Sequence, residues 1–335
     1  MLVDVQLDAR PDLAVERARE LAGSGVGGLF TFEGQHDVFG PLTLAAGAGL
    51  DIDLMTNVAI ALPRSPMHLA NAAYDLQLLS RGRFRLGLGS QVKPHIEHRY
   101  GASWSAPAAR MRECILAVRA ILDAWQHGTR LDFRGEFTRH TLMTPAFDPG
   151  PNPHGVPPIL LGALGPVMTR TAAEVADGLL VMPFHSHRHF RERTLPAVEE
   201  GLRRSGRGMD EFAIEPQAIL AMGETPAEQA EAAVGVRWLL AFYASTPAYR
   251  PVLEVEGWAD LQPELNALSK SGDFEAMTGL IDDRMLTTLA IRGTPEECAV
   301  ELRHRFGDVA ERVCCYFPGA RPSVAALSRL VAALA

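Results

Sequence analysis

Short apolar runs alternate with amphipathic segments along the whole chain. The apolar runs predict strands at residues 2–7, 28–32, 52–61, 84–88, 158–161, 178–182, 213–222 and 312–317. Between them, apolar side chains recur at spacings of three and four, the period of a helix buried on one face. In residues 108–125 this stripe consists of Met111, Cys114, Ile115, Val118, Ile121 and Leu122. Strands that alternate with helices predict parallel βαβ units, and eight of them predict an α/β fold of the (β/α)8 TIM-barrel type.

Two helix starts carry a complete chemical signature. Thr225 and Thr294 are each followed by a proline, and Glu228 and Glu297 stand three residues after them. A threonine and a glutamate at this spacing form a capping box, and proline is favoured at the first helical position. We therefore expect helices to begin at both threonines.

Two segments interrupt the alternation. Residues 128–155 contain a possible hairpin around 133–142 and a tail rich in proline and glycine, and residues 244–292 contain several short helical pieces. They follow the fourth and seventh predicted strands, where insertions on a barrel usually shape its mouth or a subunit contact. Neither segment looks like a separate domain, so we expect one domain over residues 1–335.

Charge and composition narrow the class of partner. The net charge is −8, which argues against binding to nucleic acid or to an anionic membrane surface. No apolar run approaches the roughly 20 residues of a membrane span, and the start of the chain lacks a signal-peptide pattern. The four cysteines form no CxxC motif, as expected of reduced thiols in a cytoplasmic protein. A small-molecule substrate is the expected partner.

Motifs in the expected order resemble one known family. The run LSRGRFRLGLG at residues 79–89 is similar to the LSxGRxxLGLG signature of the luciferase-like flavin and deazaflavin oxidoreductases. The segments RSPMHLA at 64–70, PILLGALGP at 158–166 and AEVADG at 173–178 resemble further motifs of that family. With Glu33, His36 and Asp37 near the start, the resemblance spans the barrel. It implies coenzyme F420 as cofactor, with FMN as the alternative, and a homodimer.

The βα turn after the fifth predicted strand is the candidate phosphate site. It consists of Gly162, Ala163, Leu164, Gly165 and Pro166. Small residues let backbone N–H groups approach a phosphate, and a helix N-terminus adds partial positive charge. The alternative is an ordinary tight turn, and the resemblance favours the phosphorylated tail of a cofactor.

Two other strand ends are expected beside the cofactor ring. In the resembling family a non-prolyl cis peptide forms a bulge at the position of Thr56, Asn57 and Val58. The alternative is a regular strand that ends at Asn57. Ser90 and Gln91 follow the fourth predicted strand and are the other candidates for cofactor contacts.

His36 is the leading catalytic candidate, because similar deazaflavin enzymes place an active-site histidine here. Its imidazole can exchange a proton near neutral pH, Asp37 could orient it, and Glu33 is a candidate acid. The alternative is that His36 only binds the cofactor or caps a loop. Gly40 and Gln91 stand where the sugar- and alcohol-oxidising relatives carry tryptophan and glutamate, so those two oxidations are disfavoured.

A histidine-rich segment remains after the sixth predicted strand. His185 and His189 would share a helix face, but no nearby acid or cysteine completes a ligand set. We therefore predict a solvated loop and no metal site. Glu97, in the loop after the fourth strand, is a second candidate for the missing acid.

These features predict an F420-dependent oxidoreductase that transfers a hydride between deazaflavin C5 and a small organic substrate. An FMN-dependent monooxygenase supplied by a separate reductase is the first alternative. A non-catalytic flavin-binding barrel is the second. The substrate and the direction of transfer stay open.

Overall fold

Eight parallel strands close into a barrel in the computed structural model, which describes residues 1–7 and 10–335. Each strand pairs with the next, β12 pairs with β1, and β9 pairs with β10, so the ring is complete. The strands are β1 (Leu2–Gln6), β2 (Gly28–Thr31), β3 (Asp53–Thr56), β5 (Phe84–Gly89), β8 (Ile159–Ala163), β9 (Gly178–Val181), β10 (Ala213–Met222) and β12 (Arg312–Tyr316). The predicted TIM barrel is confirmed.

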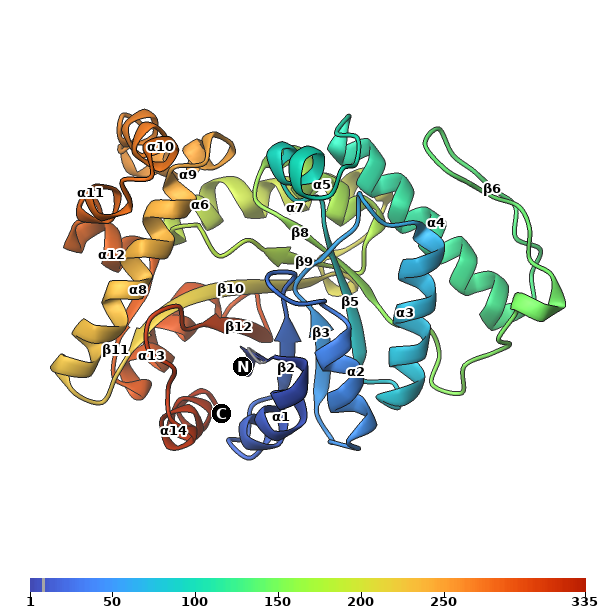
Figure 1. Ribbon diagram of the computed structural model, residues 1–335, viewed down its shortest axis with the longest axis horizontal. Helices are drawn as coiled ribbons and strands as arrows, with labels where there is room; N and C mark the ends of the chain where they lie inside the picture. The colour runs from blue at the N-terminus through green and yellow to red at the C-terminus, as the bar shows by residue number, and fades with distance from the viewer. Residues whose placement is uncertain (8–9) are drawn as a thin grey trace.

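Helices surround the barrel (Figure 1) because alternate strand residues such as Val3, Val5 and Leu54 point outward into one large apolar core. Both predicted capping boxes are present, at the starts of α8 and α13. The main helices are α1 (Ala14–Ala22), α2 (Gly40–Gly47), α3 (Pro66–Leu79), α4 (Pro107–His127), α5 (Pro166–Val175), α7 (Leu195–Ser205), α8 (Pro226–Ala244), α13 (Pro295–Phe306) and α14 (Val324–Leu334). No helix among the described residues is long and apolar enough to cross a membrane.

The third predicted strand is divided in two. It ends as β3 at Thr56 and resumes as β4 (Ala59–Ile60), and the peptide bond between Asn57 and Val58 is cis. The expected bulge is therefore confirmed, and the alternative of a regular strand is wrong. A further strand, β11 (Ile291–Gly293), was not predicted, and it pairs with the end of β10. All four cysteines are free and buried.

Both insertions lie where the sequence places them. The first contains the hairpin of β6 (Phe133–Arg134) and β7 (Arg139–His140). Glu113 on α4 fixes its turn by accepting hydrogen bonds from three successive backbone N–H groups, at 2.6–2.8 Å. The second forms α9 (Arg250–Glu256), α10 (Leu261–Ser271), α11 (Phe274–Gly279) and α12 (Asp283–Leu289), which share an apolar cluster with α8.

Charged side chains fill the amino-terminal end of the barrel interior. Asp4 accepts hydrogen bonds from Arg85 at 2.7 Å and from Arg312 at 2.5 Å. Arg85 also pairs with Glu215, and Arg312 pairs with Asp53. We call these five residues the ionic plug. Above it lies an apolar layer of Phe30, Met55, Leu160, Leu180 and Cys314.

Candidate functional site

The bulge between β3 and β4 forms the floor of the barrel mouth, above the apolar layer. Val58 is only partly buried and packs on that layer. A Cβ on Gly89 would overlap the Val58 side chain, and one on Gly87 would overlap the Thr56 carbonyl. The Thr56 hydroxyl ties the bulge to β5, because it donates to the Gly87 carbonyl at 2.8 Å and accepts from the Gly87 N–H at 3.0 Å. Only glycine in β5 therefore leaves room for the bulge.

The side chain of Asn57 is buried without a partner. It is 3% exposed, and neither amide atom has a hydrogen-bond partner among the described residues. Its backbone carbonyl accepts a hydrogen bond from Tyr316 at 3.3 Å. The Tyr316 ring lies 4.9 Å from that of Phe30, centroid to centroid. An unpaired buried amide costs about 1–3 kcal/mol, so a bound molecule with polar ring atoms would offset a cost that the protein alone does not.

The N-terminus of α5 is open to an anion. Its N-cap residue, Gly165, provides no side chain to the first turn, and Pro166 occupies the first helical position. Gly165, Pro166 and Val167 are exposed, and nothing lies within 4 Å of a Cβ built on Gly165. The free N–H groups of the first turn and the helix dipole therefore face open space at the end of β8. Ala163 and Leu164, which lead into the turn, are buried.

Ser90 and Gln91 shape the loop that follows β5. The Ser90 hydroxyl donates to the Gln91 carbonyl at 3.1 Å, and Gln91 Oε1 accepts from the Val92 N–H at 3.0 Å. Gln91 adopts a left-handed backbone conformation with φ of 59°. Both side chains are half-buried, and these local bonds fix the turn at the barrel mouth.

Glu33 connects three segments of the rim. Its carboxylate accepts hydrogen bonds from the Ile60 N–H at 2.8 Å, from Arg64 at 2.6 Å and from the Tyr100 hydroxyl at 2.8 Å. Burial, and then the bond to Glu33, raise the pKa of Tyr100 to about 12. Because both oxygens of Glu33 are engaged, the geometry favours a positioning role over proton transfer.

His36 is exposed in the loop between β2 and α2. Asp37 does not orient it: within the described residues, Asp37 Oδ1 accepts from the N–H groups of Phe39 at 2.9 Å and Gly40 at 2.7 Å. Asp37 therefore fixes the entry into α2. Glu97 lies in a short π-helix after β5, with its carboxylate 3.9 Å from Lys93.

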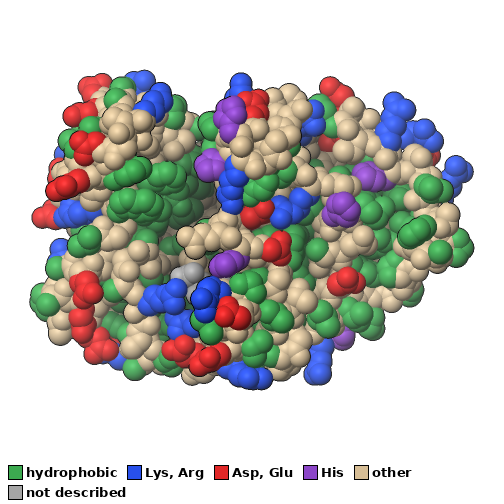
Figure 2. Space-filling view, in the orientation of Figure 1, with side chains coloured by type: hydrophobic (Ala, Val, Ile, Leu, Met, Phe, Trp, Pro, Cys, Tyr) green, Lys and Arg blue, Asp and Glu red, His purple; other side chains and the backbone are tan. Residues whose placement is uncertain are grey.

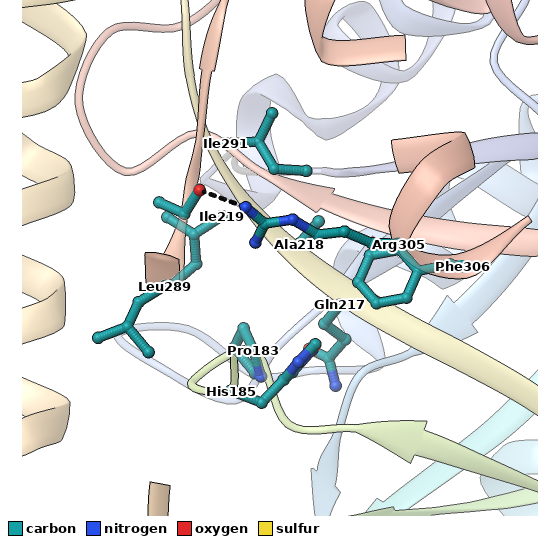
Figure 3. Close-up of a pocket in the computed structure, with 10 residues that line it drawn as sticks. Pro183, His185, Gln217, Ala218, Ile219, Leu289, Ile291, Arg305 and Phe306 are labelled. Carbon is teal, nitrogen blue, oxygen red and sulfur yellow. Dashed lines mark hydrogen bonds between the residues drawn. The ribbon is translucent and has the colours of Figure 1, made fainter. Parts of the chain in front are cut away.

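The histidine segment after β9 is not a solvated loop, which corrects the sequence-based expectation. His185 and His189 are 4% and 3% exposed. Figure 3 shows His185 beside Gln217 and Pro183 at a cavity of about 10 Å³, room for about one water molecule. Burial lowers the pKa of His185 to about 3 and that of His189 to about 4. Aromatic neighbours that are far away in sequence, such as Phe306, cover the His185 ring.

A larger hollow of about 430 Å³ lies outside the barrel beside this segment. Its charged lining is paired internally: Arg188 with Glu192, and Arg305 with Glu301. Arg191, also in the lining, pairs with Asp308 outside it. The charges of these arginines are balanced within the protein, whereas the neutral amide of Asn57 has no hydrogen-bond partner among the described residues.

Sequence reasoning missed two groups at the barrel axis. Asp4, Glu215 and Cys314 place potential metal-ligating atoms within 4.8 Å of one another, but the arginines of the ionic plug already pair with both carboxylates. Tyr316, on the floor of the mouth, was also missed. The available signal was a hydroxyl-bearing side chain at the carboxyl end of this strand, after three apolar residues.

The family model described as luciferase-like monooxygenase matches residues 3–311. The chain belongs to this luciferase-like family. An uncharacterised protein of Mycobacterium tuberculosis is 48% identical and covers 92% of this chain and 90% of its own. The 5,10-methylenetetrahydromethanopterin reductase of Archaeoglobus fulgidus is 28% identical over 78% of this chain and 76% of its own.

The fold is shared with a solved reductase. The coenzyme F420-dependent tetrahydromethanopterin reductase of Methanopyrus kandleri superimposes with a TM-score of 0.80, covering 98% of this chain and 95% of that one, at 21% identity. Because the identity is low, this likeness establishes the barrel alone.

Proposed function

We propose that this chain is an oxidoreductase that uses coenzyme F420 to transfer a hydride to or from a small organic substrate. The carrying observation is the buried amide of Asn57 in the bulge, which has no partner in the part of the chain that the structure describes. At the same end of the barrel, no side chain caps the N-terminus of α5. Membership of the luciferase-like family and similarity to a 5,10-methylenetetrahydromethanopterin reductase support an oxidoreductase.

The residues at the mouth fit such a cofactor. Asn57 offers an amide donor and acceptor for the polar edge of a flat ring, Val58 offers an apolar surface, and the Gly165–Val167 turn offers N–H groups to a phosphate. Thr56, Ser90 and Gln91 maintain the backbone around them. When bound, the deazaflavin supplies hydride transfer at C5 without reacting readily with oxygen.

His36 is the proposed proton-transfer residue. Hydride transfer to a carbonyl or imine requires one proton at the substrate heteroatom, and an exposed imidazole on the β2 loop can deliver or remove it. Glu33 contributes indirectly, because it ties that loop to Ile60, Arg64 and Tyr100. Replacement of His36 with alanine should retain F420 binding and lower turnover by about 10²–10⁴-fold. Equal turnover by the variant and the parent would exclude this role.

Titration of the protein with F420 and, separately, with FMN tests the cofactor. Binding followed by fluorescence and by thermal shift should give at least tenfold tighter affinity for F420. The main rival, an FMN-dependent monooxygenase, is favoured by the family's description. It requires tight binding of FMN, no response to F420, and oxygen-dependent turnover.

A non-catalytic flavin-binding barrel is the second rival. Such a protein would bind F420, but no substrate in a broad panel would support oxidation of the reduced cofactor.

We also propose that the chain forms one domain and that two copies form a homodimer. Limited proteolysis would test the first proposal, and sedimentation equilibrium would test the second.

A further inference from the structure

Two aromatic side chains on α8 form an exposed apolar surface. Trp238 and Phe242 are 46% and 38% exposed, although both are large and apolar. Their rings are stacked, with 5.7 Å between centroids and 3° between planes. They stand one helical turn apart, so together they present a pair of parallel rings, which we call the aromatic wall. The opposite face of α8 is buried through small residues such as Ala233 and Val236.

The helix that carries the aromatic wall borders the barrel mouth. A Cβ on Gly235 would overlap Gly319, and one on Gly319 would overlap the Ala232 carbonyl, so α8 touches the loop that leaves β12. Trp238 and Phe242 follow Gly235 at helical spacings of three and seven and so lie on the same side of α8. Figure 2 shows hydrophobic side chains gathered beside a hollow near the centre of this face, over the region of α8 and α9.

Contacts at the end of α8 reach toward the cofactor side of the mouth. The ring of Tyr243 lies 6.0 Å from that of Phe242 and 5.9 Å from that of Phe184, which follows β9. Because Phe184 follows the carboxyl end of β9, these ring contacts connect the exposed wall with the rim of the barrel mouth.

We propose that the aromatic wall is the substrate subsite, and that the substrate is a flat, largely apolar molecule with an unsaturated ring. This proposal rests on the proposed function, because it assigns the second reactant of that site. Parallel aromatic faces favour a planar ring by offset stacking, in addition to the burial of apolar area.

The size of the wall identifies its occupant as a small molecule. A fully buried aromatic side chain covers about 150–250 Å², whereas a stable protein interface needs about 800 Å² on each partner. The exposed parts of two stacked rings offer far less, an area suited to contact with one small ring system.

Calorimetric titration with two probes of equal size tests the proposal. The probes are 2-naphthol, which is flat, and decahydro-2-naphthol, which is saturated and puckered. The protein, titrated both with and without F420, should bind 2-naphthol more tightly than decahydro-2-naphthol. The Trp238→Ala variant should weaken 2-naphthol binding about tenfold, which corresponds to about 1.4 kcal/mol, and should reduce the preference between the probes. Trp238→Phe should restore most of the affinity. Phe242→Ala should have a smaller effect.

Val234→Ala is the matched control, because Val234 is 65% exposed on the same helix and lies outside the ring pair. It should change 2-naphthol binding less than twofold. Equal binding of 2-naphthol by the parent and Trp238→Ala overturns the proposal, as does an equal loss in Val234→Ala. A change of oligomeric state in Trp238→Ala, measured by sedimentation, would instead assign the wall to a subunit contact and also overturn it.

The cofactor and the probe are titrated separately, so the two proposals fail differently. Absence of F420 binding together with Trp238-dependent 2-naphthol binding refutes the proposed cofactor alone. Normal F420 binding with Trp238-independent 2-naphthol binding refutes the aromatic wall alone.

Discussion

The two ends of the barrel interior differ in how their polar groups are paired. At the amino-terminal end, the carboxylates of Asp4, Asp53 and Glu215 are all matched to Arg85 or Arg312. At the carboxyl end, the amide of Asn57 is buried and has no partner within residues 1–7 and 10–335. The charges at the first end are balanced within the protein, although Arg85 Nε and Glu215 Oε2 lack partners among the described residues. We propose that a bound molecule completes the second end.

We expect this difference to separate stability from function along the barrel axis. In barrels of this type, the carboxyl ends of the strands carry catalysis and the opposite face carries stability. Substitutions in the ionic plug should therefore lower the free energy of unfolding and leave cofactor affinity unchanged. Substitutions in the bulge should lower cofactor affinity and leave the free energy of unfolding unchanged or slightly higher.

Removal of one arginine from the ionic plug should have the largest effect. Arg85→Met leaves Asp4 and Glu215 short of a partner, and an uncompensated buried charge costs about 3–5 kcal/mol of unfolding free energy. Urea denaturation measures this loss, while F420 affinity per folded molecule should stay unchanged. Arg83→Met is the control: it removes an ion pair with the exposed Asp51 and should cost under about 1 kcal/mol. Equal losses in the two variants would contradict the role of the plug.

The buried histidines after β9 should affect stability rather than ligand binding. Burial lowers the pKa of His185 to about 3 and that of His189 to about 4, so both stay neutral in the folded protein. The unfolded chain takes up these protons below about pH 6.5. Stability is thus full above that pH and is lost on acidification, by about 1.4 kcal/mol per pH unit for each histidine.

Urea unfolding at pH 7, 6 and 5 should show this slope, and His185→Gln should reduce it by one proton. His127→Gln, at the exposed end of α4, should leave it unchanged. An unaltered slope in His185→Gln would mean that His185 does not remain neutral in the fold.

Asn57→Leu should separate stability from binding. Removing a buried amide that lacks a partner should leave the free protein as stable or up to about 1 kcal/mol more stable, and should weaken F420 binding about tenfold. Asn266→Leu is the contrasting control, because the Asn266 amide donates to the Ser245 carbonyl at 2.9 Å. That variant should lose stability and keep F420 affinity. A loss of stability in Asn57→Leu with unchanged F420 affinity would assign Asn57 to stability and not to cofactor binding.

A cap on α5 should give the smallest change in stability. Gly165→Asp supplies the missing N-cap side chain and should stabilise the helix by a few tenths of a kcal/mol. The same carboxylate would repel a bound phosphate, so F420 affinity should fall. Gly165→Asn provides a neutral cap of the same shape and should weaken binding less. Equal affinities for the aspartate and asparagine variants would place the phosphate elsewhere.

Much of the fold follows from local sequence. Alternating periodicity located the eight barrel strands, and the capping boxes located the starts of α8 and α13, because these signals depend on neighbouring residues. The strand β11 was missed because its three residues gain their partner only when the chain returns to β10. The burial of His185 depends on Phe306, which is distant in sequence.

Among the candidate site residues, too, only the features set by local sequence could be predicted. The turn at Gly165 could be predicted, since a glycine-rich link between a strand and a helix has a local chemical meaning. The roles of Glu33 and Asp37 could not, because they depend on which N–H groups the folded chain places around each carboxylate. The ionic plug left a readable trace: Asp4, Arg85 and Glu215 each interrupt an apolar strand at a position that faces the barrel axis.

Hydrogen–deuterium exchange with and without F420 tests the contrast between the two ends most directly. At saturating F420, the account predicts added protection at residues 56–60, 87–91 and 162–169, and unchanged exchange at residues 2–4, 84–85 and 213–215. Protection confined to the outer hollow around residues 186–192, or no change at the carboxyl end of the barrel, would contradict it.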